Sequence, residues 1–199
     1  MAKVIVVNSI SLDGVMQSPA ARDEDPRNGF ERGGWAAPYG DEVMGQKMGE
    51  EMMRGGSLLF GRHTYEHFYS VWPSAPQPNP FTERLNNTQK YVVSNSLREP
   101  LPWVNSTLLS GDGVTSVERL KEELPADHNL CVLGSGVLLH SLIAKGLIDE
   151  YLLLIHPLIL GSGLRLFPED VYSPLKLKES VTTTTGVVIA KYEPEPSPT

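Results

Sequence analysis

Residues 58–66 read LLFGRHTYE, an apolar run that stops at Gly61 and passes directly into Arg62, His63 and Thr64. Consecutive apolar residues are typical of a strand that is buried on both faces, and glycine allows a tight turn where such a strand ends. The backbone N–H groups at a helix start are free to bind an anion. This stretch therefore predicts a buried strand, a glycine turn and a helix whose first turn can hold a phosphate.

The same alternation of apolar runs and helical patterns continues on both sides of this stretch. Two β-rich segments around Gly186 predict an antiparallel hairpin at the sheet edge, and Thr115 and Glu118 have the spacing of a helix capping box. Alternating strands and helices predict an α/β fold with a largely parallel sheet. The expected strands cover residues 3–10, 57–61, 90–96, 129–136 and 148–160. The expected helices cover residues 41–54, 62–69, 116–124 and 136–145.

The composition is that of an ordinary globular protein, since 40% of the 199 residues are hydrophobic and 21% are charged. We expect one domain over residues 1–193, a surface loop at the proline-dense stretch 72–80 and a disordered tail at 194–199. The formal charge of −7 argues against nucleic acid or an anionic membrane as partner. Cys131 is the only cysteine and no apolar run reaches the roughly 20 residues of a membrane span, so we expect a cytoplasmic protein.

Three of the expected strands end in residues that suit a phosphate. One ends at Gly61, the next at Ser94 and Asn95, and a third in the GSG motif of residues 134–136. In open α/β sheets, ligands bind at the carboxyl ends of the strands. Each feature alone also fits a simple turn or a solvated surface, but their joint placement favours a site for a pyrophosphate and one further phosphate.

Several motifs resemble, in order, those of the dihydrofolate reductase-like superfamily. FGRHTYE (60–66) resembles its glycine-arginine-x-threonine segment, and VLGSG (132–136) resembles its diglycine turn. NSISLDGVM (8–16) and GLIDEYLLLIHPLILGSGLRLF (146–167) resemble the opening and closing motifs of one branch, the riboflavin-biosynthesis reductase domain, or RibD C-terminal domain. The resemblance extends from about residue 3 to residue 193 and is specific as an ensemble.

This resemblance implies a three-layer α/β/α fold and a homodimeric oxidoreductase that uses NADPH. The implied activity is similar to that of 5-amino-6-(5-phosphoribosylamino)uracil reductase, with hydride transfer to a small carbonyl or imine substrate. Arg62 would lie at the 2′-phosphate of the cofactor, and the loop of Val15 and Met16 at its nicotinamide. The full set of positions that the resemblance assigns to the cofactor is Val15, Met16, Gly61, Arg62, His63, Thr64, Ser94, Asn95, Gly134, Ser135, Gly136 and Val137.

The substrate half of the expected site departs from the family's pattern. A dihydrofolate reductase has a carboxylate on its first helix, and a gap-free count from FGRHT places Gly45 at that position, which makes folate a poor substrate. Asp13 is the alternative catalytic acid; it either donates a proton beside the nicotinamide or belongs to an Asp-Gly turn. The candidates for the substrate pocket are Trp35, Met48, Met52 and Trp72.

Other functions remain open from the sequence. Dihydrofolate reductase-like activity is one, and a catalytically silent NADPH-binding module is another, because a fold can persist without turnover. A remote alternative is a zinc hydrolase, since His63, Glu66 and His67 match the pattern H-x-x-E-H with both histidines on one helix face. A zinc site needs a third ligand, for which the sequence offers no obvious motif, so we expect no metal.

Overall fold

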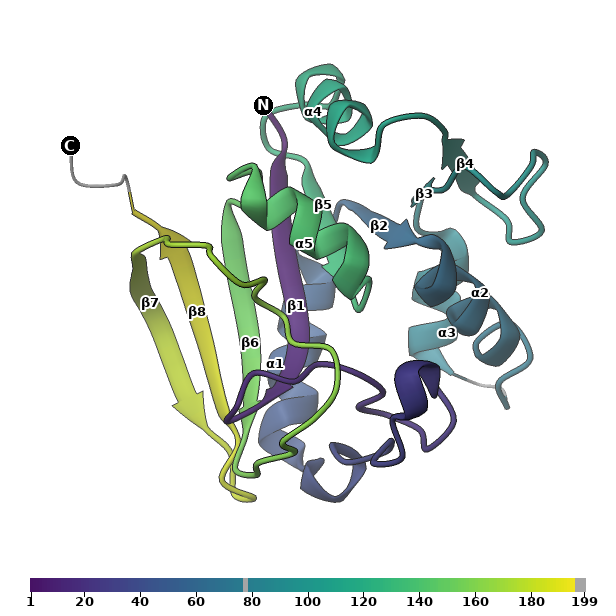
Figure 1. The fold of residues 1–199 in the computed structure, drawn as a ribbon. Helices are drawn as coiled ribbons and strands as arrows, with labels where there is room; N and C mark the ends of the chain where they lie inside the picture. The colour runs from purple at the N-terminus through teal and green to yellow at the C-terminus, as the bar shows by residue number, and fades with distance from the viewer. Residues whose placement is uncertain (77–78, 196–199) are drawn as a thin grey trace.

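A computed structural model describes residues 1–76 and 79–195, apart from the side chains of residues 52 and 53. Within these residues the chain forms an eight-stranded sheet with the order β4-β3-β2-β5-β1-β6-β8-β7 (Figure 1). The strands from β4 to β6 run parallel, whereas β8 and β7 are antiparallel to their neighbours. The bounds are β1 (Lys3–Ser11), β2 (Ser57–Gly61), β3 (Lys90–Val93), β4 (Ser106–Leu109), β5 (Asn129–Leu133), β6 (Glu150–His156), β7 (Leu175–Thr182) and β8 (Val188–Pro194).

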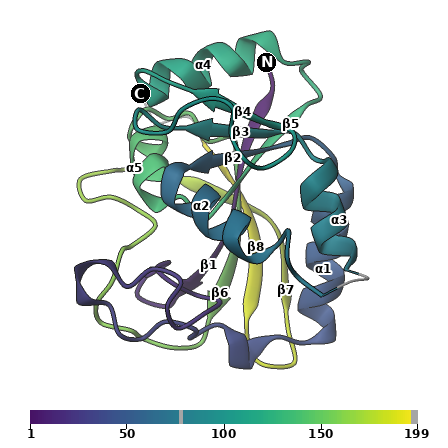
Figure 2. The same cartoon turned by 90° about the vertical axis from the view of Figure 1, so that its right-hand side faces the viewer.

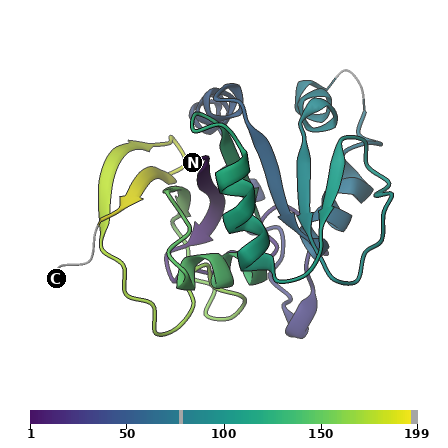
Figure 3. The same cartoon turned by 90° about the horizontal axis from the view of Figure 1, so that it is seen from above.

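Helices cover both faces of this sheet. Helices α4 and α5 lie on one face, and α1, α2 and α3 lie on the other (Figure 1, Figure 2). The view from above separates the two helical layers most clearly (Figure 3). The bounds are α1 (Glu42–Met53), α2 (Arg62–Val71), α3 (Pro80–Asn87), α4 (Gly113–Glu123) and α5 (Gly136–Ala144), with short 3-10 turns at Arg27–Gly29 and Ala37–Tyr39. Among the residues that the structure describes, no helix is both long and apolar enough to cross a bilayer.

The face under α4 and α5 is a continuous apolar core. Val4 of β1 and Leu130 of β5 are fully buried there, together with Leu139 and Leu142 of α5. Complete burial of a side chain of this kind contributes about 1.5–3 kcal/mol, so this layer supplies much of the stability of the sheet.

The opposite face is covered in two separate parts. Phe60 of β2 packs with Tyr65 of α2 and Leu85 of α3 at one end of the sheet. Met44 and Met48 of α1 pack at the other end against a cluster formed by β6 and the C-terminal strands. Between these two helical groups a cavity lies over the central strands β5 and β1.

The predicted architecture is confirmed. The fold is a three-layer α/β/α arrangement with a mostly parallel sheet, and the segments around Gly186 form the antiparallel strands β7 and β8. Two elements were not expected, the four-residue strand β4 and helix α3, which follows the proline-dense loop and begins at Pro80. Both are too short to show a clear period in the sequence.

Several predicted boundaries were wrong for local reasons. The strand expected to reach residue 160 ends at His156, before Pro157, which has no N–H to donate to a neighbouring strand. The capping box was also wrong, because α4 begins at Gly113 and Asp112 accepts the backbone N–H of Thr115 at 2.8 Å. At the C-terminus, the sheet includes Pro194, which pairs with Leu175 where a tail was expected; residues 196–199 lie outside the described residues.

Candidate active site

The ends of β2 and β5 are joined by two hydrogen bonds between their helix starts. The backbone N–H of Gly61 donates to Ser135 Oγ at 3.0 Å, and the backbone N–H of Ser135 donates to Thr64 Oγ1 at 2.8 Å. Neither α2 nor α5 has a capping side chain, so the N–H groups of their first turns remain available to a ligand. Two adjacent helix starts with free N–H groups are suited to bind an anion.

The turn between β5 and α5 requires its glycines. Gly134 and Ser135 both have left-handed backbone angles, with φ of 58° and 57°. A Cβ on Gly134 would lie 3.0 Å from Thr64, and one on Gly136 would lie 2.5 Å from Leu164. The side chain of Asn8 holds this turn, accepting the N–H of Gly134 at 2.8 Å and donating to its carbonyl at 3.3 Å. The backbone is therefore fixed in a shape that lets a phosphate approach closely.

Arg62 lies partly exposed at the start of α2. Its Nη2 is 3.3 Å from Nε2 of His63, and no carboxylate of the described residues pairs with it. An arginine without a protein anion beside two free helix starts is suited to bind a phosphate group.

Ser94 and Asn95 lie at the same edge, because Val93 at the end of β3 is in register with Gly61. Their side chains shape the local loop, since Ser94 Oγ accepts the N–H groups of Ser96 and Leu97. Asn95 exchanges two hydrogen bonds with Gly111, one in each direction. Both residues therefore lie at the predicted edge, but their side chains are partly used in hydrogen bonds that form the local turns.

The remaining cofactor candidates fall in different environments. Val15 is fully buried and pairs with Arg165 through the backbone, so its side chain does not line the cavity. Met16 and His63 do line the cavity. Val137 is 63% exposed at the start of α5, beside a smaller surface pocket that Leu164 also lines.

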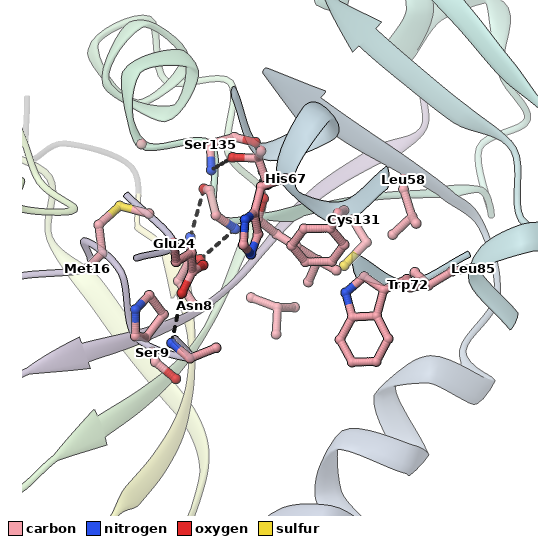
Figure 4. Close-up of a pocket in the computed structure, with 18 of the residues that line it drawn as sticks. Asn8, Ser9, Met16, Glu24, Leu58, His67, Trp72, Leu85, Cys131 and Ser135 are labelled. Atoms are coloured by element: carbon pink, nitrogen blue, oxygen red, sulfur yellow. Dashed lines mark hydrogen bonds between the residues drawn. The ribbon is translucent and has the colours of Figure 1, made fainter. Parts of the chain in front are cut away.

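The main cavity has a volume of about 920 Å³ and extends from the turn at Gly134–Gly136 to the space between α1 and α3. Figure 4 shows Asn8, Ser9 and Met16 at one end, with Leu58, Trp72 and Leu85 at the other. We call the second part the apolar chamber. Its floor and walls are formed by Ile5, Val7, Met48, Leu58, Phe68, Trp72, Leu85, Cys131, Leu133 and Leu154.

The apolar chamber contains two of the predicted pocket residues. Trp72 packs edge-on against Phe81, with ring centroids 4.5 Å apart, and Met48 lines the wall formed by α1. Cys131 faces the chamber from β5, and burial raises the pKa of its thiol to about 12, so the thiol stays neutral. The side chain of Met52 lies outside the described residues.

Glu51 and Arg54, which line the cavity, are already paired with other charged groups. Glu51 binds Arg54 at 2.7 Å and Lys191 at 2.8 Å, and Arg54 also binds the buried Glu150. Burial alone would raise the pKa of Glu51, but the hydrogen bonds to Arg54 and Lys191 lower it, so this carboxylate is ionised. It is therefore poorly suited to donate a proton.

A second pair of charges lies in the loop that follows β1. Asp25 accepts two hydrogen bonds of 2.6 Å from the guanidinium of Arg27. Burial would raise the pKa of Asp25, but Arg27 lowers it through its hydrogen bonds and its charge. Glu24 uses its carboxylate to accept the backbone N–H of Ala20 at 2.8 Å.

Asp13 has the geometry of a turn residue. Its carboxylate accepts hydrogen bonds from Ser11 Oγ at 2.6 Å and from the backbone N–H groups of Leu160 and Gly161 at 3.0 and 2.8 Å. The hydrogen bond from Ser11, followed by those from Leu160 and Gly161, lowers the pKa of Asp13 to about 2. Asp13 does not line the cavity, so the structure favours the turn hypothesis over the proton-donor hypothesis.

Trp35 was expected in the pocket, and this prediction was wrong. It is buried in a separate cluster with Val15, Phe30 and Leu160, and its indole N–H donates to the carbonyl of Gln17 at 2.7 Å. Gly45 does not line the cavity either; the cavity face of α1 presents Met44, Met48 and Glu51, which are spaced by one helical turn each.

Ser9 and His156 form a polar pair that the sequence did not suggest. Ser9 lines the cavity, and His156 Nε2 lies 3.2 Å from its Oγ. His156 is 1% exposed, and the described residues offer its Nδ1 no hydrogen-bond partner. Burial lowers the pKa of His156 to about 4, so the ring is neutral near pH 7. The available signal was Asn8 and Ser9 themselves, two polar residues inside an otherwise apolar strand.

The histidines of the zinc alternative both line the cavity. Within residues 1–76 and 79–195, however, no three His, Cys, Asp or Glu side chains gather closely enough to hold a metal ion. The part of the chain that the structure describes therefore supplies no third ligand to His63 and His67.

Comparison with known proteins gives one family and several relatives. The model of the RibD C-terminal domain family matches residues 2–189. The uncharacterized protein YyaP of Bacillus subtilis strain 168 is 30% identical over 144 residues, which cover 68% of this chain and 72% of the relative.

Solved structures agree on the fold. A protein from Shewanella sp. PV-4 whose name refers to riboflavin biosynthesis superposes with a TM-score of 0.67 at 22% identity, covering 98% of this chain and 100% of the other. Dihydrofolate reductase from Enterococcus faecalis, complexed with NADP(H), superposes with a TM-score of 0.61 at 13% identity, covering 98% and 97%. At these identities the likeness supports the dihydrofolate reductase-like fold alone.

Proposed function

The chain belongs to the RibD C-terminal domain family, and from that premise we propose that it is an NADPH-dependent reductase that transfers a hydride to a small carbonyl or imine substrate. The observation that carries the proposal is the pair of joined, uncapped helix starts at Gly61 and Ser135. They present free N–H groups and a close-approach glycine turn at one edge of the sheet, which suits a pyrophosphate.

In this proposal the two helix starts hold the pyrophosphate, and Arg62 binds the 2′-phosphate next to the loop of Ser94 and Asn95. Val15, Met16 and Gly136 would lie on the nicotinamide side. When bound, NADPH supplies the hydride; the chain supplies orientation, a water-poor surface and hydrogen bonds. The fit rests on the turn at Gly134 and Gly136, where a Cβ would clash with Thr64 or Leu164, so that only glycine allows this backbone beside the helix start.

In this proposal Ser9, and not Asp13, is the polar side chain that contacts the reacting group of the substrate. A buried N–H without an acceptor is rarer than a buried lone pair without a donor, so we infer that the unpartnered Nδ1 of His156 carries no proton. Nε2–H then donates to Ser9 Oγ, which leaves the serine O–H free to donate into the cavity. There it can donate a hydrogen bond to the carbonyl oxygen or imine nitrogen of the substrate, which takes up a proton from water as the hydride is transferred.

Dihydrofolate reductase-like activity is the weaker alternative. Its acid would be a free carboxyl group on α1, and the carboxylate that α1 presents to the cavity, Glu51, is held by Arg54 and Lys191.

The test of the cofactor site is the variant Arg62→Ala. If Arg62 binds the 2′-phosphate, its loss weakens NADPH binding by about 1.5–3 kcal/mol, the range of a hydrogen bond to a charged group, while NADH binding changes little. Isothermal titration calorimetry with both cofactors measures the difference. Arg119→Ala is the matched control, since Arg119 is exposed on α4 and pairs only with Glu123 among the described residues.

The outcomes separate the alternatives. An equal loss for NADPH and NADH would refute the role of Arg62. Tight NADPH binding without oxidation by a panel of carbonyls and imines would indicate the silent binding module. If neither cofactor binds the unaltered protein, both the reductase and the module are excluded.

A further inference from the structure

We propose that the substrate of this reductase carries an uncharged, largely apolar ring system without a phosphate group, and that this part lies in the apolar chamber over β5 and β1. The inference rests on the proposed function, because it takes the Gly134–Gly136 end of the cavity as the place of the nicotinamide. It departs from the phosphoribosyl pyrimidine that the family resemblance implied.

The protein leaves an apolar surface uncovered on the chamber side of its central strands. Along β5, Leu130 and Val132 are fully buried under α4 and α5, whereas Cys131 and Leu133 point to the chamber and stay partly exposed. Val7 of β1 is likewise partly exposed in the chamber. A concave apolar surface of this kind in a soluble protein marks a ligand site, because leaving it in water costs free energy.

Within the described part of the chain, the arginines that line the cavity are, with one exception, bound to carboxylates. Arg54 lines the cavity, but it already binds Glu51 and Glu150. Arg27 is held by Asp25 in the loop after β1. A phosphate bound there would have to displace one of these pairs and leave a buried carboxylate without a partner, which is strongly unfavourable.

Arg84 is the one lining arginine to which no described carboxylate is paired. It lies on α3 and is exposed, whereas strands form the floor of the cavity. A cation in water contributes little to phosphate binding compared with a desolvated one. Because Arg84 could still attract a phosphate group, the test compares the apolar probe with a phosphorylated compound.

One wall of the cavity is aromatic. Phe68 of α2, Trp72 directly after it and Phe81 of α3 line the cavity on the side opposite Met48 of α1. A ring between aromatic side chains and a flexible methionine gains both apolar burial and ring contacts. The cavity volume of about 920 Å³ is at the upper end of the range typical of small-molecule sites and leaves room for such a ring beside the reacting group.

The experiment compares two carbonyl compounds with the full chain in the presence of NADPH. The apolar probe is 2-naphthaldehyde, and the phosphorylated probe is ribose 5-phosphate. Binding is followed by the shift in thermal unfolding temperature, and turnover by the loss of NADPH absorbance. We expect 2-naphthaldehyde to bind and to be reduced with a kcat/KM at least tenfold above that of ribose 5-phosphate.

Val71→Glu then tests the place of binding. Val71 lines the cavity and is 42% exposed on α2, so a charge there is tolerated by the fold but lies against the chamber. We expect it to raise the dissociation constant of 2-naphthaldehyde at least tenfold. Ser70→Glu is the matched control; it adds the same charge at the neighbouring exposed position, which does not line the cavity, and should change the constant less than twofold.

Each outcome bears on one proposal. The inference of an apolar substrate is overturned by any of three results. These are a preference for ribose 5-phosphate, binding of neither probe, or an equal effect of the two glutamate variants. If NADPH binds with the expected dependence on Arg62 while any of these occurs, the reductase proposal stands and only this inference fails. If 2-naphthaldehyde binds with the expected dependence on Val71 but NADPH does not bind, the chamber stands and the reductase proposal fails.

Discussion

Residues 130–133 of β5 are all apolar, but alternate residues have different surroundings. Leu130 and Val132 are fully buried under α4 and α5, while Cys131 and Leu133 face a cavity bounded by α1, α2 and α3. An uninterrupted apolar strand predicts that both sides are covered; it does not say whether protein or ligand covers them. In this molecule one side contributes to stability and the other is available for recognition.

The largest expected effect is on stability, and it should differ between the two sides of β5 when leucine is replaced by alanine on each. Leu130→Ala should lower the free energy of unfolding by about 2–5 kcal/mol, because it leaves a cavity in a closed core. Leu133→Ala should cost about 1 kcal/mol, because its side chain is already partly exposed. Urea unfolding of the ligand-free protein measures both. Similar losses would mean that the chamber side supports the fold as much as the core side does.

On the chamber side of the sheet, His156, which contacts Ser9, should make the stability of the protein depend on pH. Burial lowers its pKa from 6.5 to about 4, so on acidification the unfolded chain takes up a proton before the folded chain does. The free energy of unfolding therefore falls as the pH drops from about 6.5 towards 4, by about 2 kcal/mol between pH 7 and pH 5.

His156→Gln removes this titration. The variant should lose less stability than the unaltered protein between pH 7 and pH 5, as measured by urea unfolding at each pH. A loss as large in the variant as in the parent would show that other groups cause the acid sensitivity.

The smallest expected effect concerns α4, which covers the closed side. Asp112→Ala removes the N-cap and should cost about 1 kcal/mol. Glu118→Ala, which would disrupt the capping box expected from the sequence, should change stability by less than about 0.5 kcal/mol. Thermal unfolding of the two variants measures both losses. A larger loss for Glu118→Ala than for Asp112→Ala would support the capping box and contradict the N-cap at Asp112.

Long apolar runs and glycine turns were enough to predict the sheet and the edge at which the candidate site lies. The strand-glycine-helix stretch around Gly61 and the GSG motif both form helix starts there, as their local chemistry indicates. Short elements were missed, because four residues in β4 and eight in α3 carry too little periodicity.

The substrate half could not be predicted because it depends on contacts far apart in sequence. From the sequence Asp13 could be either a free acid or a turn residue, and the groups that bind its carboxylate, the N–H groups of Leu160 and Gly161, lie 147 and 148 positions away. Trp35 looked like a planar pocket wall, but its indole N–H is bound by Gln17 inside another cluster. No local pattern indicates which of several polar or aromatic residues the folded chain turns towards a cavity.

The hydrogen bonds between the helix starts also link binding to folding. Gly61 and Ser135 are 74 positions apart, and Thr64 and Ser135 are 71 apart, so the proposed anion site can form only when β2 and β5 lie side by side. A chain in which β2 and β5 are not yet paired lacks the hydrogen bonds that join the two helix starts. A ligand that binds there recognises the assembled sheet alone, and its binding free energy adds directly to the stability of the sheet.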